Sequence, residues 1–251
     1  NQALQNTQLK KYKRETVNAG DDVSFLLTED LDALRRGADA IRKALCGQYA
    51  ELCSIINGRS GRCPENCKFC AQSACWQTKI EEYPFLEPTA ILSDCVFMSQ
   101  TRERYSVVTA GRALSGQEFE QALAAYRSMA KKLDINLCAS HGLLSEADFH
   151  RLKEAGVTRY HANYRNFPEK FPEYLTTHTF DDKLEVIRRA RAAGLDVCSG
   201  GIIGMGETWE DRVDMAFTLS GLKILSIPLN VLRLFQHTFE IFPSDHEEIF
   251  K

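Results

Sequence analysis

A β-branched segment, Tyr105-Ser106-Val107-Val108-Thr109-Ala110, opens the most informative part of the sequence, and Gly111 closes it. The segment Ile135-Asn136-Leu137-Cys138-Ala139-Ser140 has the same apolar character. Between the two, apolar side chains recur at the spacing of one helical stripe: Phe119, Leu123, Tyr126 and Met129. A strand, an amphipathic helix over 115–133 and a second strand predict a crossover unit whose two strands run parallel.

This alternation continues on both sides of the unit. We expect further strands at 52–56, 157–163, 195–198 and 224–232. Helices are expected at 31–45, 89–103, 145–155, 180–193 and 208–222, with a loop at 167–174. About six βα units predict an α/β protein with a TIM-barrel-type parallel βα barrel, partial or truncated. We place this barrel domain at 28–232, between a polar N-terminal segment, 1–27, and a divergent C-terminal tail, 233–251.

Composition restricts the class of protein. The 251 residues are 44% hydrophobic, enough for one sizeable core, and the net charge of −3 provides no basic field for nucleic acid. No apolar run is long enough to predict a membrane span, and residues 1–13 lack the apolar core of a signal peptide. Nine cysteines, an odd number, predict metal ligation in a reducing cytoplasm rather than disulfides.

Three of these cysteines lie on one short loop, Cys63-Pro64-Glu65-Asn66-Cys67-Lys68-Phe69-Cys70. Thiolates are soft ligands that select iron–sulfur clusters, zinc or Cu(I). Structural zinc normally takes four protein ligands, whereas three cysteines on a four-iron cluster leave one iron open for a substrate or cofactor. The alternative is a zinc knuckle or a group of buried free cysteines. The spacing favours the cluster.

Residues with chemical function also gather where the predicted strands end: Gly111-Arg112, Cys138 to His141, Asn163, and Cys198 to Gly201. In parallel βα barrels the active site is built from the C-terminal ends of the strands. We therefore expect these residues to meet the cysteine loop at one mouth of the barrel.

The last of these groups continues as a glycine-rich turn, Gly200-Gly201-Ile202-Ile203-Gly204-Met205-Gly206-Glu207. Glycines allow close approach of a ligand to the backbone, or a positive φ. Taken alone, the turn is equally compatible with a plain strand-to-helix connection.

The remaining thiols and imidazoles have simpler interpretations. Cys46 and Cys53 are expected to be buried small hydrophobic residues, as are Cys138 and Cys198 when considered alone. Cys75 is either a spare thiol or an additional ligand. His141 and His178 are either structural, hydrogen-bonded residues or ligands.

The cysteine loop, with an aromatic residue before its last cysteine, resembles the radical S-adenosylmethionine (SAM) enzymes. Its flanks, 57–62 and 71–74, and the segments 198–202 and 206–212 resemble the biotin synthase family within that group. The resemblance covers about residues 30 to 230. It implies that Cys63, Cys67 and Cys70 hold a [4Fe–4S] cluster and that the glycine turn binds SAM through a set of residues: Gly200, Gly201, Ile202, Gly204 and Glu207.

The same resemblance implies roles for residues at two other strand ends. Asn163 would contact both SAM and the substrate, dethiobiotin, as a catalytic and cofactor-binding residue. Cys138 and Cys198 would help to hold an auxiliary iron–sulfur cluster, [2Fe–2S] or another type, that supplies the inserted sulfur. The implied reaction uses a 5′-deoxyadenosyl radical, made from SAM, to abstract hydrogen from dethiobiotin. A reductant such as flavodoxin or ferredoxin, and a homodimer, are implied as well.

Four departures from the family pattern limit this inference. The stretch 105–112 lacks a cysteine that most family members carry, and Leu175 stands where one branch of the family has another. Arg165 replaces a carboxylate, and an unrelated tail begins at Arg233. We therefore expect weak SAM cleavage, little biotin and a labile auxiliary cluster with two protein sulfurs. A radical SAM enzyme with one cluster, or an inactive relative, remains the alternative.

Overall fold

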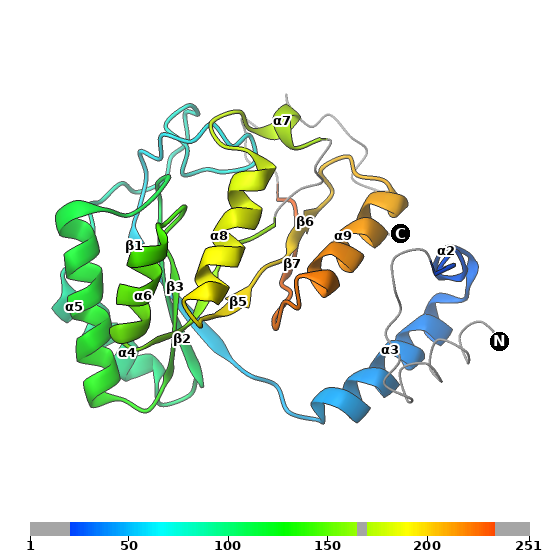
Figure 1. Ribbon diagram of the computed structural model, residues 1–251, viewed down its shortest axis with the longest axis horizontal. Helices are drawn as coiled ribbons and strands as arrows, with labels where there is room; N and C mark the ends of the chain where they lie inside the picture. Colours follow the sequence, from blue (N-terminus) through cyan, green and yellow to red (C-terminus); the bar gives the residue numbers. More distant parts are fainter. Residues whose placement is uncertain (1–20, 165–169, 234–251) are drawn as a thin grey trace. The chain divides into compact units, whose positions relative to one another are not determined.

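The computed structural model describes residues 21–164 and 170–233. Five parallel strands form its main sheet in sequence order (Figure 1): β1 Cys53–Arg59, β2 Arg104–Thr109, β3 Asn136–Ser140, β4 Val157–His161 and β5 Asp196–Cys198. Two further strands, β6 Gly201–Ile203 and β7 Leu229–Val231, pair in parallel as a separate two-stranded sheet. The parallel order confirms the predicted α/β fold class.

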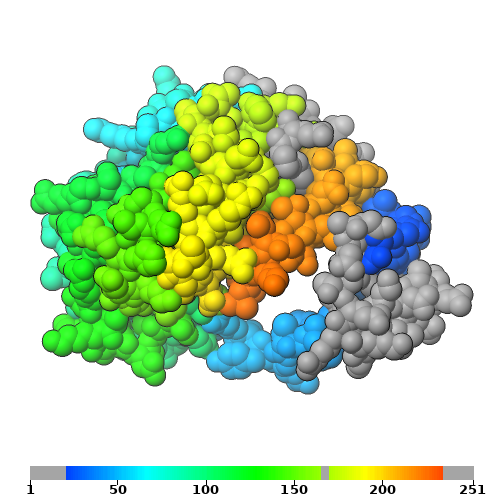
Figure 2. Space-filling view, in the orientation of Figure 1, coloured from blue at the N-terminus to red at the C-terminus, as the bar shows by residue number. Residues whose placement is uncertain are grey.

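Helices connect the strands of the main sheet and cover one of its faces: α4 Pro88–Met98, α5 Gly116–Lys132, α6 Glu146–Glu154 and α8 Phe180–Ala192. In the space-filling view, α5, α6 and α8 form a continuous layer of green and yellow side chains (Figure 2). Alternate strand residues make the core beneath them: Tyr105, Val107, Leu137, Ala139, Tyr160 and Val197. Because strand side chains alternate between faces, the intervening residues point to the opposite side, here called the inner face.

Local sequence explains where two of these helices begin. Ser145 accepts a hydrogen bond from the backbone of Asp148, and the Asp148 side chain accepts one in return, so a capping box starts α6. Thr179 and Asp182 form the same arrangement at α8. Each box satisfies amide donors that would otherwise lack a partner in the first helical turn.

Residues 21–50 and 208–218 belong to a compact unit of their own. In its described part lie α2 Phe25–Thr28, α3 Leu31–Cys46 and most of α9 Trp209–Gly221. The Asp30 side chain caps α3 by accepting from Ala33 N at 2.9 Å. In the described ranges every helix is too short or too polar to cross a membrane. The predicted domain boundaries at residues 27 and 232 stay predictions.

Several predicted elements need correction. The expected loop at 167–174 contains a short helix, α7 Phe171–Tyr174, and the expected glycine turn contains β6, because the β-branched pair Ile202-Ile203 suits a strand. The helix expected at 89–103 ends at Met98. Cys46 and Cys53 are exposed, not buried. Cys46 is the last residue of α3, and Cys53 points from the edge strand β1 to the inner face, away from the helix layer.

Candidate active site

The cysteine loop follows β1 and folds back on itself. Cys63 N donates to Gln72 O at 3.0 Å, and Ala74 N donates to Cys63 O at 2.8 Å. Within the loop, Cys70 N donates to Cys67 O at 3.1 Å. These bonds bring the three cysteines, which the sequence predicts to be ligands, to one side of a closed turn.

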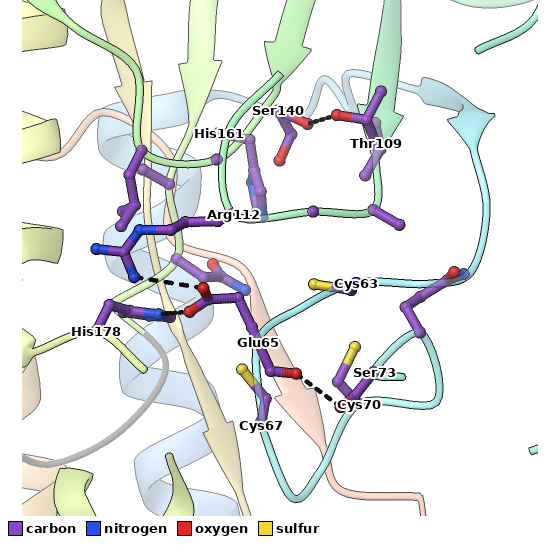
Figure 3. A pocket seen from close by; sticks show the side chains of 18 of the residues that line it. Cys63, Glu65, Cys67, Cys70, Ser73, Thr109, Arg112, Ser140, His161 and His178 are labelled. Atoms are coloured by element: carbon purple, nitrogen blue, oxygen red, sulfur yellow. Dashed lines mark hydrogen bonds and ion pairs between the residues drawn. The ribbon is translucent and has the colours of Figure 1, made fainter. Parts of the chain in front are cut away.

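The three thiols line one cavity of about 200 Å³. Figure 3 shows their sulfur atoms arranged around the same space. Cys63 and Cys67 are buried and Cys70 is half-buried. Burial raises the pKa of the Cys63 thiol, while hydrogen bonding by the backbone of Glu65 and Gly111 opposes the rise. In the described residues no three Cys, His, Asp or Glu side chains are placed to hold a single metal ion.

Glu65, between the first two cysteines, anchors the loop. Its carboxylate accepts from Thr177 Oγ1 at 2.7 Å and from Arg112 Nη1 at 3.3 Å, and it contacts His178 Nδ1. Its backbone oxygen accepts from Ser73 Oγ at 2.6 Å. Burial alone would raise the pKa of Glu65, but these donors outweigh burial and lower it. The charged carboxylate therefore ties the cysteine loop to the segment that precedes α8 (Figure 3).

Residues from the C-terminal halves of four strands complete the cavity: Asn57, Thr109, Ser140 and His161. Asn163, just beyond β4, also lines it, and its Oδ1 accepts from Gly200 N at 3.0 Å. Of the strand ends predicted to meet the cysteine loop, Gly111-Arg112, Ser140 and Asn163 line the cavity with it, whereas Cys198 to Gly201 do not. Arg165, the departure expected to weaken SAM binding, lies outside the described residues.

The glycine turn is organised by its own acidic residue. The Glu207 carboxylate accepts from Gly204 N at 2.9 Å and from Met205 N at 2.8 Å. Gly204 has φ +92°, a conformation that other residues rarely adopt. The other predicted residues of the turn, Gly200 to Ile202, are placed beside the cavity rather than in its lining. Ile202 and Met205 belong to a small apolar cluster with Phe69 of the cysteine loop, so the turn and the loop pack together.

The two candidate histidine ligands are both hydrogen-bonded in the structure, and His178 also lines the cavity. His141 is fully buried, and its ring nitrogens lie 3.1 Å from Thr109 Oγ1 and 2.9 Å from Tyr126 Oη. Burial lowers the pKa of His141 to about 3, so its ring is neutral in the folded protein. His178 is bound to Glu65. Cys75, for which the sequence allows either a spare thiol or an additional ligand, is exposed.

Cys138 and Cys198 lie on the inner face rather than in the cavity lining. Burial raises the pKa of the Cys138 thiol to about 11, and its sulfur accepts from Arg104 Nη1 at 3.6 Å. The Cys198 thiol donates to Ser226 Oγ at 3.4 Å. Cys53, which the sequence predicts to be a small core residue, lies on β1 in register with Arg104 and so shares the inner face.

The sequence reading also missed Glu65, Arg104 and Arg159. A signal existed for the two arginines: Arg159 is a charged residue inside the predicted strand 157–163, and Arg104 directly precedes the predicted strand 105–110, each at a period of two from another inner-face residue. Glu65 stands between the cysteines, but its partners Thr177 and His178 are more than 100 residues away. Nothing local connects them to the loop.

Comparison with known proteins agrees with the resemblance inferred from the cysteine loop. Residues 59–219 match the family model described as the Radical SAM superfamily. The chain is 55% identical over 230 residues to a biotin synthase of Clostridium beijerinckii, covering 89% of this chain and 73% of that protein. It is 50% identical over 245 residues to a biotin synthase of Alkaliphilus metalliredigens, covering 96% and 76%.

Solved structures show the same fold at much lower identity. The crystal structure of methylornithine synthase (PylB) matches with a TM-score of 0.79 at 17% identity, over 93% of this chain and 70% of that chain. That of HydG, a maturase of the [FeFe]-hydrogenase, matches with a TM-score of 0.80 at 15% identity, over 96% and 57%. At these identities the likeness concerns the fold alone.

Proposed function

The chain belongs to the biotin synthase family of the radical SAM superfamily, and we propose that it inserts sulfur into dethiobiotin to form biotin. Membership of this family implies that the chain uses a [4Fe–4S] cluster, SAM, a small-molecule substrate and a redox partner. One observation carries the residue-level proposal: three cysteines from one loop and the ends of four parallel strands line a single cavity.

Cys63, Cys67 and Cys70 are the residues that would hold the cluster. The three thiols of the loop are a donor set that fits an iron–sulfur cluster, and three such ligands would leave one iron open for SAM. When bound, the cluster and SAM supply a carbon radical strong enough to abstract hydrogen from unactivated carbon. The protein's part is to hold these groups in place and to keep water from them.

The residues around the loop have positioning roles in this proposal. Glu65 fixes the loop through its bonds to Thr177 and Arg112. Asn163 faces the cavity and at the same time accepts from Gly200 N at 3.0 Å, so it joins the cavity to the glycine turn. The Glu207 bonds hold that turn in a shape with open backbone, against which SAM would lie.

Sulfur for the product would come from an auxiliary cluster held on the inner face by Cys138 and Cys198. Cys138 is two residues from Ser140, which lines the cavity. Parallel strands present their C-terminal ends at one mouth, so a substrate in the cavity would lie above this face of the sheet. Dethiobiotin would therefore meet the radical source and the sulfur source from different sides.

The activity is tested with anaerobically reconstituted chain, SAM, dithionite and dethiobiotin. We expect 5′-deoxyadenosine and biotin, both measured by mass spectrometry, and neither when SAM or the reductant is omitted. 5′-Deoxyadenosine without biotin would identify a radical SAM enzyme of another substrate class. If chain with its full iron content forms neither product, the proposal is contradicted.

A further inference from the structure

The chain between Cys63 and Cys67 is bound to the segment 176–178, which lies about 110 residues away in sequence and precedes α8. Asn66 Nδ2 donates to Thr176 Oγ1 at 2.8 Å, and Thr176 N donates to Asn66 Oδ1 at 2.9 Å. Each side chain or backbone group in this reciprocal pair is both fixed by and fixes its partner. The stretch between the first two cluster cysteines is therefore held in one place by protein contacts.

These contacts hold the carboxylate of Glu65 at the wall of the cavity. Glu65 is 5% exposed and lines the cavity together with the three cysteines of the loop. Thr177 Oγ1 donates to it at 2.7 Å, and Figure 3 shows the carboxylate bonded to Arg112 and His178. A buried carboxylate remains charged only when donors of this kind compensate for the lost water. The cavity therefore has a fixed negative charge between its first two thiols in sequence.

This charge acts on a sulfur atom of the loop. Burial is the main cause of the raised pKa of the Cys63 thiol, and the charge of the Glu65 carboxylate adds to it. A carboxylate that disfavours a thiolate also disfavours any other negative charge at the same place. Reduction of an iron–sulfur cluster adds one electron, and the net charge around a cluster is one of the factors that set its reduction potential.

We propose that Glu65 lowers the reduction potential of the cluster held by the cysteine loop, and that Thr177 and Arg112 are the positioning residues that keep its carboxylate at the cavity wall. The inference rests on the proposed function for the presence of that cluster. One electron from the redox partner, passed on to SAM, breaks a carbon–sulfur bond to give methionine and the 5′-deoxyadenosyl radical. A lower potential makes this electron a stronger reductant, so the charge of Glu65 favours SAM cleavage.

The test is a redox titration of the anaerobically reconstituted full chain, followed by electron paramagnetic resonance. The signal that changes when SAM is added reports the loop cluster. Glu65→Gln keeps the side-chain length and one acceptor oxygen but removes the charge. Iron should be retained, and the potential should rise by at least about tenfold in the one-electron equilibrium, which is about 59 mV. Glu65→Asp keeps the charge but shortens the reach to Thr177, so iron retention should fall while the potential stays low.

A matched control removes a carboxylate outside the cavity. The Glu82 side chain is 47% exposed and binds the exposed Arg62 at 2.7 Å. Because water and salt screen an exposed charge, Glu82→Gln should change neither iron retention nor the potential.

A variant of opposite sign completes the test. The Arg112 side chain, 47% exposed against 7% for Glu65, offsets part of the carboxylate charge. Arg112→Gln should therefore lower the potential, by less than Glu65→Gln raises it. An unmoved potential in a Glu65→Gln chain that retains iron would overturn the inference. If that chain loses its iron, an unchanged or raised potential in Arg112→Gln would do so instead. Neither result would touch the proposed function, which fails only if the unmodified chain forms no loop cluster or does not cleave SAM.

Discussion

The two sets of three cysteines differ in how the chain brings them together. Cys63, Cys67 and Cys70 lie within eight consecutive positions, and backbone hydrogen bonds within the loop close them around one cavity. Cys53, Cys138 and Cys198, here called the inner-face cysteines, come from β1, β3 and β5 and share one face of the sheet only because those strands adopt one register. Closing a short loop costs little chain entropy, whereas assembling three distant strands requires the whole sheet.

Their electrostatic surroundings differ in the same way. Beside the three loop cysteines the charge of Arg112 is balanced, since Arg112 is bound to the Glu65 carboxylate. The inner-face cysteines share their face of the sheet with Arg104 and Arg159. The Nε of each arginine is buried and has no hydrogen-bond partner among the described residues. One site is therefore encoded by local sequence and the other by topology. Changes to the loop and changes to the sheet should affect them separately.

The largest expected effect comes from removing the loop thiols. Changing Cys63, Cys67 and Cys70 together to Ala should reduce 5′-deoxyadenosine formation to the level without enzyme, because no open iron remains to bind and cleave SAM. The matched triple Ala variant of the inner-face cysteines should still cleave SAM and should lose biotin formation. Quantitative mass spectrometry of both products checks the pair. SAM cleavage by the loop variant would show that these cysteines do not hold the cluster.

A smaller effect is expected from the turn after β5. A Cβ added at Gly200 would lie 1.8 Å from the backbone oxygen of Pro228, which cannot move as a side chain would. Gly200→Ala should therefore lower the free energy of unfolding of the metal-free chain by about 2 to 4 kcal/mol, measured by urea denaturation. Gly221→Ala is the control, because nothing lies within 4 Å of its Cβ position.

The same variant separates the two sites. Cys198 is two residues from Gly200, and its bond to Ser226 Oγ at 3.4 Å spans the gap that would have to open. Iron held by the inner-face cysteines should fall in Gly200→Ala, while iron held by the cysteine loop should persist. An equal loss from both sites would mean that the loop depends on the sheet as much as the inner face does.

The contrast also explains what sequence alone could predict. The parallel fold follows from apolar strands alternating with amphipathic helices, and the loop cysteines from their spacing within one turn. Sequence alone predicts a small core residue at Cys53, because nothing near it in the sequence indicates that Cys138 and Cys198 lie on the same face of the sheet. The network of Glu65 with Thr177 and His178 was missed for the same reason. Contacts between residues on different strands can be predicted only when the register of those strands is known. The pattern of a single sequence does not provide that register.

Acid should weaken the sheet through one residue that belongs to neither site. His141, the residue after β3, is fully buried between Thr109 Oγ1 and Tyr126 Oη, and burial lowers its pKa to about 3. In the unfolded chain an ordinary histidine titrates near about 6.5. The unfolded state therefore binds a proton that the folded state refuses, and stability contributed by the neutral ring falls as the pH drops below about 6.5.

The expected slope is about 1.4 kcal/mol per pH unit, so between about pH 6.5 and 5 the metal-free chain should lose about 2 kcal/mol from this residue. Gln at this position keeps a donor and an acceptor but does not titrate. His141→Gln should be less stable at neutral pH, because the packing is imperfect, yet lose less stability on acidification. His150→Gln, at a side chain that is 52% exposed on α6, is the matched control and should follow the unmodified chain. Parallel pH curves for all three proteins, measured by urea denaturation, would show that His141 accepts its proton without unfolding, and that the sheet beneath the inner-face cysteines is less sensitive to acid than its buried ring implies.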